Sequence, residues 1–337
     1  MGTVKEGARQ AVEVCMKIKS SDKVIIVGDH KSKKVMNALE IASKKVTKNV
    51  KAFCLEDYGK RPIKKLPKEI AECAAWSTAA FFTAQSAPGE KNSIRKPLIT
   101  IATRKTGSRQ AHMPGVTELM MKTGMCANYD LVQKLSKKIL NLAKKAKEIR
   151  VTTKKGTDFT ASFSPKIKWV LADGDIPAKP SRWSNLPDGE VFTCPKNSEG
   201  ALIVDGSLGD WFGPKYGLME KQRLEITVKN SRVIDVKCKN KKLLRDFKKY
   251  IKQDKNANRI GEFAIGTNIG LKKLIGILLQ DEKFPGIHIA VGDSYPSHTD
   301  SGWGSKAHCD MVIKKVNIFI DGKQIMKEGK FLIKLKR

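Results

Sequence analysis

The chain has 337 residues, of which 40% are hydrophobic and 29% charged, a composition typical of a folded globular protein rather than of a disordered or fibrous one. No apolar run approaches the roughly 20 residues that span a bilayer, and the first residues lack the apolar core of a secretory signal. We therefore expect a cytoplasmic protein without a membrane partner. Seven scattered cysteines, never in a C-x-x-C pair, indicate neither a disulfide framework nor a thiolate zinc site.

The formal net charge of +31 is the strongest compositional feature. Such a charge is expected of proteins that bind nucleic acids. The lysines are spread along nearly the whole chain, however, and aromatic residues make up only 7% of it, which argues against a stacking platform for single strands. We expect nucleic acid to bind only through non-specific electrostatics, and keep a basic nucleic-acid-binding protein without activity as an alternative.

The first half alternates short apolar runs with segments of helical spacing. Strands are predicted at residues 23–29, 50–55, 79–83 and 97–102, and helices at 33–46 and 69–76. This alternation predicts an α/β domain over residues 1–149 with an open, largely parallel sheet. No G-x-G-x-x-G fingerprint and no phosphate loop accompanies these strands, which argues against a dinucleotide site.

The second half is predicted to be rich in β-strands. A helix over residues 131–148 leads into three strand pairs, separated by turn signals at 155–158, 230–231 and 321–322. One further helix is predicted at 241–253. We therefore expect an α+β, β-rich domain over residues 150–337.

Three of the five histidines, His288, His298 and His308, lie within 21 residues of one another in this second half. His308-Cys309-Asp310 is an H-x-D pattern in a predicted strand, where the period of two places His308 and Asp310 on one face, able to hold the same ion. Taken alone, the pattern is more often a hydrogen-bonded surface pair, and a strand histidine such as His288 is more often a satisfied core residue.

Two glutamates strengthen the hypothesis of a metal site. Glu190 follows a Pro-Asp-Gly turn at the start of an apolar strand, and Glu262 lies in a strand that is otherwise too apolar for a carboxylate. An inward-facing Glu262 would need a cation or strong hydrogen bonds, whereas an edge strand would leave it in solvent. The sequence by itself leaves both arrangements open.

Together these segments resemble the aminopeptidase T-type leucyl aminopeptidases, a family of thermophile-associated dinuclear metallopeptidases. The resemblance spans about residues 183–312, with a weaker part around residues 112–118. It rests on five motifs in a fixed order: N-L-P-D-G-E-V-F (185–192), G-E-F-A-I-G-T-N (261–268), D-E-K (281–283), H-I-A-V-G-D-S-Y (288–295) and H-x-D (308–310).

The resemblance implies a hydrolase that removes N-terminal residues from short peptides through a hydroxide shared by two divalent ions, Zn²⁺, Co²⁺ or Mn²⁺. It implies that Glu190 bridges the ions, that Glu262 and His288 complete one site, and that His308 and Asp310 complete the other. The catalytic residues would be Tyr295, donating to the oxyanion, and Glu262, as ligand or base. A homodimer with a partly enclosed chamber is also implied.

The same scaffold is shared by ring-cleaving dihydroxypyridine dioxygenases, which use one Fe²⁺ held by two histidines and an aspartate. Here His288, His308 and Asp310 could form such a facial triad. The presence of Glu190, Glu262 and Tyr295 favours the dinuclear peptidase. A mononuclear Fe(II) ring-cleaving dioxygenase therefore stands as the alternative enzyme.

Overall fold

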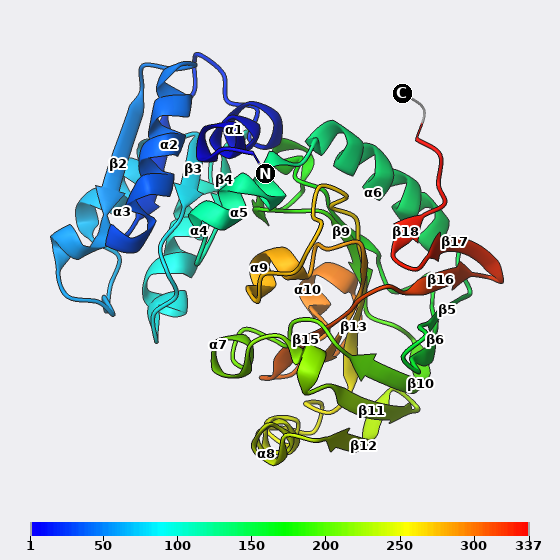
Figure 1. Cartoon of the computed structure of the whole chain (residues 1–337). Coiled ribbons are helices and arrows are strands. Elements are labelled where there is room, and N and C mark those ends of the chain that lie inside the picture. The colour runs from blue at the N-terminus through cyan, green and yellow to red at the C-terminus, as the bar shows by residue number, and fades with distance from the viewer. Residues whose placement is uncertain (1, 336–337) are drawn as a thin grey trace. The chain divides into compact units, whose positions relative to one another are not determined.

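The computed structural model describes residues 2–335, which form two compact units (Figure 1). Unit 1 contains residues up to 133 together with 174–188, and unit 2 contains 134–173 and the chain from 189 onward. This division differs from the single boundary expected near residue 149. The reason is strand β8 (Trp183–Asn185), which pairs with β4 (Arg109–His112) in the sheet of unit 1. None of the helices within residues 2–335 has the length and apolar character needed to cross a bilayer.

Unit 1 is built on a five-stranded parallel sheet of order β2-β1-β3-β4-β8, as the α/β pattern predicted. All five residues of β1 are buried, because helices cover a central parallel strand. Figure 1 shows helices α2 to α4 running beside these strands. The remaining strands are β1 (Val24–Gly28), β2 (Val50–Cys54) and β3 (Ala79–Phe82). The helices are α1 (Val4–Arg9), α2 (Lys33–Lys44), α3 (Lys68–Trp76), α4 (Lys96–Ala102) and α5 (Glu118–Lys122).

The strand predicted at residues 97–102 is wrong, because this segment is helix α4. Pro97 lies at the beginning of α4, which directly continues the π-helical segment Lys91–Arg95. Leu98 and Ala102, four residues apart, are both buried, which is a helical and not an alternating pattern. A short apolar run cannot be assigned to strand or helix from periodicity alone.

Unit 2 contains two antiparallel sheets. The larger has the order β12-β11-β10-β6-β5-β16-β17-β18, and the smaller has the order β15-β14-β13-β9-β7. The strands of the larger sheet are β5 (Glu148–Thr152), β6 (Asp158–Ser162), β10 (Asn197–Val204), β11 (Leu224–Lys229), β12 (Arg232–Cys238), β16 (Asn317–Ile320), β17 (Lys323–Lys327) and β18 (Lys330–Phe331). Those of the smaller sheet are β7 (Val170–Ala172), β9 (Glu190–Thr193), β13 (Ile260–Gly266), β14 (Gly286–Gly292) and β15 (His308–Ile313).

Two longer helices and three short ones complete the fold. Helix α6 ends before the lysine-rich turn that precedes β5, five residues earlier than predicted, and α8 lies beside β12 (Figure 1). The helices are α6 (Tyr129–Ala143), α7 (Gly213–Tyr216), α8 (Lys241–Tyr250), α9 (Leu278–Asp281) and α10 (Pro296–Thr299). All three predicted hairpins are present, as β5–β6, β11–β12 and β16–β17.

The smaller sheet has one apolar and one polar face. The apolar face carries alternate residues of four strands, which belong to the main hydrophobic core of unit 2: Val191, Phe263, Ile265, Ile287, Ile289, Val291, Cys309, Met311 and Ile313. The residues between them point to the opposite face, because side chains alternate along a strand. Strands β13 and β14 are buried along their whole length, so this second face is covered as well.

Candidate metal centre

Strand register brings the five predicted ligands to one face of the smaller sheet. Residues directly opposite each other in an antiparallel ladder share a face. Glu190 is opposite Gly266, Glu262 opposite Ala290, and Ala290 opposite Asp310. Because 262 and 266, 288 and 290, and 308 and 310 are each an even number of residues apart, all five ligands point away from the apolar core.

The imidazoles and carboxylates are within ligand distance of one another. His288 Nε2 lies 3.3 Å from Glu262 Oε1 and 3.4 Å from Glu190 Oε2. His308 Nε2 lies 3.2 Å from Asp310 Oδ1 and 3.5 Å from Glu262 Oε2. The two oxygens of Glu262 therefore face different histidines. Glu262 is shared by two overlapping groups, one with Glu190 and His288 and the other with His308 and Asp310. A further group, of Glu282, His288 and Asp310, overlaps both of these.

This sharing bears on the expected bridging ligand. The resemblance implied that Glu190 would contact both ions; among the described residues, Glu190 belongs to one candidate group, with Glu262 and His288. The register explains the difference, because Glu262 is on β13, between β9 and β14, whereas Glu190 begins β9 and lies further from β15. Glu262 is therefore a second candidate for the bridging ligand beside Glu190.

His308 is oriented by its surroundings. Its Nδ1 lies 3.1 Å from the carbonyl oxygen of Asp293, to which it can donate, and its Nε2 faces the carboxylates. When the imidazole is neutral, this arrangement leaves the lone pair on Nε2. The hydroxyl of Tyr250 accepts from the backbone N–H of His308 at 3.0 Å and donates to its carbonyl at 2.8 Å. Such outer contacts fix the ring orientation of a metal-binding histidine.

The electrostatics of this face favour bound cations. Burial alone would lower the pKa of His308, but Asp310 and Glu262 raise it to about 10. His288 follows the same pattern, with burial opposed by Glu262 and Glu190, and its pKa is raised to about 9. Burial works to raise the pKa of Asp310, yet the charge and hydrogen bond of His308 lower it to about 2. Crowded carboxylates thus hold positive charge on both imidazoles, the condition in which a divalent ion is also stabilised.

Tyr295 lies at the edge of this face, directly before α10. Its ring centroid is 4.5 Å from that of His308 and 6.2 Å from that of Phe192. Its backbone has φ 49° and ψ 56°, a left-handed conformation that is costly for a tyrosine and that clusters at functional sites. Burial, together with Glu262 and Asp310, raises the pKa of its phenol well above the usual value, so the hydroxyl keeps its proton and can donate it in a hydrogen bond.

Two charged residues of this site entered the sequence analysis only as part of the D-E-K motif and were given no role there. Glu282, at the end of α9, forms a third candidate group with His288 and Asp310. Burial raises its pKa to about 8, with Lys283 acting in the opposite direction. Lys283 is 1% exposed, and its ammonium lies 2.5 Å from Glu190 and 2.8 Å from Glu282. Both belong to the D-E-K segment. The one sequence feature that could have indicated a buried role is that these two opposite charges are adjacent and flanked by apolar residues.

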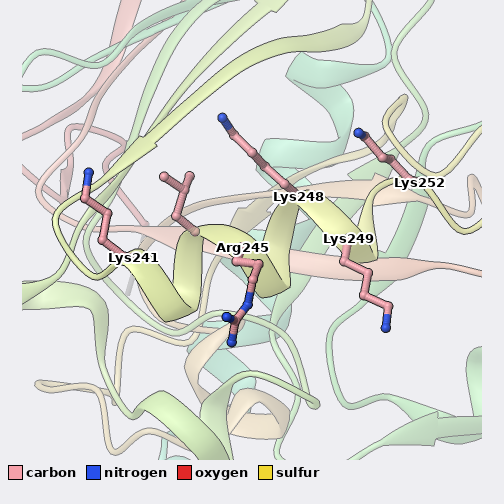
Figure 2. A pocket seen from close by; sticks show the side chains of 6 residues that line it. Lys241, Arg245, Lys248, Lys249 and Lys252 are labelled. Atoms are coloured by element: carbon pink, nitrogen blue, oxygen red, sulfur yellow. The ribbon is translucent and has the colours of Figure 1, made fainter.

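The donor set fits a divalent transition metal. Imidazole and carboxylate ligands without thiolate suit Zn²⁺, Co²⁺ or Mn²⁺. Cys309, between His308 and Asp310, points to the opposite face and packs in the hydrophobic core. A hollow of about 490 Å³ elsewhere in unit 2 is unrelated to this chemistry, since it is lined by Leu244 and five cationic side chains of α8 and the turn that follows it (Figure 2).

The site carries the ligand types of a metalloenzyme, and the chain belongs to the thermophilic metalloprotease (M29) family, whose model matches residues 128–331. The match covers every residue of the candidate metal centre. Among curated proteins, none matches this sequence significantly.

Two solved structures share the fold over nearly the whole chain. Wild-type AmpT from Thermus thermophilus is 15% identical, with a TM-score of 0.70 and coverage of 98% of this chain and 99% of that one. The 2,5-dihydroxypyridine dioxygenase from Pseudomonas putida KT2440 is 17% identical, with a TM-score of 0.69 and coverage of 98% and 97%. At these identities the likeness establishes the fold and leaves the reaction to the site.

Proposed function

We propose that this protein is a dinuclear metal-dependent aminopeptidase that acts on short peptides. The observation that carries the proposal is Glu262, whose two oxygens face His288 and His308 separately. A carboxylate in that position supports one ion on each side. Glu190 and His288 would complete the first site, and His308 and Asp310 the second.

When bound, a pair of divalent ions supplies a nucleophilic water at neutral pH and polarises the scissile carbonyl. The side chains of the protein supply the proton transfer and the hydrogen bond to the oxyanion. In this proposal Glu262 serves as ligand or as the base that takes the proton released by the water, and the protonated phenol of Tyr295 donates a hydrogen bond to the oxyanion. The family resemblance further supports assembly as a homodimer.

The alternative is a mononuclear Fe(II) dioxygenase, which the likeness to the dihydroxypyridine enzyme keeps open. It requires His288, His308 and Asp310 around one ion. Among the described residues, however, no candidate group contains both histidines. Glu262 also lies 3.3 Å from the imidazole of His288 and 3.5 Å from that of His308, where it would add a ligand that a site of two histidines and one carboxylate does not have. The geometry therefore favours two ions.

Metal content and cleavage specificity test the proposal together. Protein purified without chelator should carry close to two ions per chain and should hydrolyse a peptide with a free N-terminus but not its N-acetylated twin. One iron per chain, with ring cleavage of a dihydroxypyridine and no peptide hydrolysis, would establish the dioxygenase instead.

Single variants then separate the ligand roles. Glu262→Gln should weaken both ions, because it removes charge from each, whereas Glu190→Gln and His308→Ala should each weaken mainly one. Stepwise titration with Zn²⁺ against a chelator of known affinity measures this. If Glu190→Gln weakened both ions and Glu262→Gln only one, the bridge would be Glu190.

A further inference from the structure

Lys283 is a lysine with almost no exposed surface in the middle of the candidate metal centre. Lysine is almost never fully buried unless it is paired, because moving an ammonium out of water is costly. Here the ammonium forms ion pairs with Glu190 Oε1 at 2.5 Å and with Glu282 Oε1 at 2.8 Å. Both glutamates belong to candidate metal groups that contain His288.

The backbone delivers Lys283 to this place through a close approach. Gly266 is opposite Glu190 in the β9–β13 ladder, and a Cβ on Gly266 would lie 2.0 Å from the carbonyl oxygen of Phe284. Only glycine therefore allows the 283–284 segment to lie against the end of β13. The N–H of Asn268 donates to the Lys283 carbonyl at 3.0 Å and holds the segment there.

The Lys283 ammonium interacts more with the His288 side of the candidate metal centre than with the His308 side. One oxygen of Glu190 accepts from Lys283, and the other lies 3.4 Å from His288 Nε2. Both carboxylates that pair with Lys283 belong to groups that contain His288, whereas His308 groups with Glu262 and Asp310. Asp310 is shared, since it also groups with Glu282 and His288. The fixed cation therefore competes for carboxylate charge on the His288 side.

We propose that Lys283 is a positioning residue that acts as an internal counter-cation, holding Glu190 and Glu282 in place and making the ion beside His288 the weaker and more exchangeable of the two. This inference rests on the proposed dinuclear site. Two effects oppose each other when the ammonium is removed. Loss of its hydrogen bonds loosens the glutamates, but loss of a like charge in a buried site strengthens the attraction for a divalent ion. The charge effect dominates, because strand β9 continues to fix the backbone of Glu190.

The test measures metal affinity rather than turnover. Stepwise Zn²⁺ and Co²⁺ dissociation constants are determined by chelator competition for wild type, Lys283→Met and Lys283→Gln. The wild type should bind two ions with unequal affinity. Both variants should bind the weaker ion at least tenfold more tightly and leave the stronger ion within about threefold of wild type. A defect in folding or packing would only weaken binding, so tightening identifies the charge effect.

Two controls assign the effect to this lysine and this ion. Lys155→Met removes an ion pair with buried Asp205 in the same unit that includes none of the candidate ligands, and should leave both affinities unchanged. In a His308→Ala background the remaining ion should be the one at His288, and adding Lys283→Met should tighten it and alter its Co²⁺ absorption spectrum.

The outcomes separate the two ideas. Two ions in wild type with unchanged or weaker affinity in both folded Lys283 variants would overturn the counter-cation role. Tightening in the methionine variant alone would also overturn it, because glutamine lacks the charge as well. A wild type that binds no ion pair would overturn the dinuclear function, and the inference with it. Should Lys283→Met fail to fold, Lys283→Gln carries the comparison.

Discussion

Tyr295 shows how a single residue on this face acquires a chemical role. It is held in a strained backbone conformation directly before Pro296, with its phenol protonated and its ring against His308. Strain of about 1–3 kcal/mol persists in a fold only where surrounding contacts enforce it, and such positions cluster at functional sites. The ring contacts alone could be made by phenylalanine, which isolates the hydroxyl for testing.

Tyr295→Phe should lower kcat and kcat/KM together, by roughly 10²–10³, if the phenol equals a typical oxyanion donor. The reason is that such a donor interacts more strongly with the transition state than with bound substrate. Metal content should stay unchanged, since a neutral phenol is a poor ligand beside carboxylates and imidazoles. Steady-state kinetics with metal analysis of the same samples checks this. Wild-type turnover in the variant would show that Tyr295 only packs.

His112 in unit 1 is expected to make the free energy of unfolding depend on pH in the acid range. Its imidazole is buried, stacks on Phe82 with ring centroids 5.4 Å apart, and accepts hydrogen bonds from Arg95 at 2.8 and 3.1 Å. Burial, and then the charge of Arg95, lowers its pKa to about 3. Protonation would remove the acceptor and place a second positive charge beside the guanidinium.

The sign of the pH effect follows from this lowered pKa. The unfolded chain takes up a proton at His112 near pH 6.5, while the folded chain does so only near pH 3. Between these values the unfolded state binds more protons, so the free energy of unfolding falls as pH falls, by up to about 1.4 kcal/mol per pH unit. His112→Gln keeps an acceptor and takes up no proton, so its urea unfolding curves should lack this part of the decrease. Parallel pH dependences in the two proteins would contradict the prediction.

At the scale of elements, the sequence predicts those parts of the candidate site that depend on the alternation of side chains along a strand. The alternation around His308 and Asp310 places both on one face, as the structure shows. The order of strands could not be read, because β9 pairs with β13 across about 70 residues and no local pattern encodes that pairing. Glu282 and Lys283 were missed for the same reason, since a short segment outside regular periodicity brings them in. The roles of all these residues stay predictions until metal binding is measured.

Glycines let the strands of the site approach one another, and Gly292 gives an element-scale test. It pairs with His308, has φ +101°, and a Cβ there would lie 2.1 Å from the carbonyl oxygen of Ala307. Gly292→Ala should destabilise the protein by about 2–5 kcal/mol and weaken the His308-side ion. Gly322→Ala is the matched control, because its φ is +81° with nothing within 4 Å of the added atom. It should cost only about 1–2 kcal/mol. Equal losses in denaturant unfolding would mean that the clash is relieved by movement of the backbone.

For the whole molecule, the sequence indicated a parallel α/β half and a β-rich half, and both are present. The sequence placed the segment 174–188 in the second domain, whereas in the structure it belongs to the first compact unit, because β8 returns to the first sheet over a long range. The net charge, by contrast, follows from composition and does not depend on how the chain folds. The charge of +31 is spread over both units, and its densest stretch in unit 2 includes α8.

Helix α8 presents the charge as a stripe. One hollow is lined by five cationic side chains: Lys241, Arg245, Lys248, Lys249 and Lys252 (Figure 2). The only acidic residue of the helix, Asp246, forms an ion pair with Lys215 and accepts a hydrogen bond from Tyr216. Helix α6 and the turn after it carry exposed lysines as well, among them Lys144 and Lys145. If nucleic acid binds only through non-specific electrostatics, neither the lysines of α8 nor those at the end of α6 form a specific binding site.

The affinity for duplex DNA should therefore fall steeply with salt and should be the same for unrelated sequences at a given salt concentration. Lys248→Glu with Lys249→Glu, and Lys144→Glu with Lys145→Glu, should weaken binding to similar extents, because each pair changes the net charge by the same amount. Neither pair should alter metal content, since both lie outside the metal centre. Fluorescence anisotropy over a salt series measures these affinities. A preference above about tenfold for one sequence, or a loss confined to the α8 pair, would indicate a specific nucleic-acid site and restore the alternative function that the metal centre otherwise argues against.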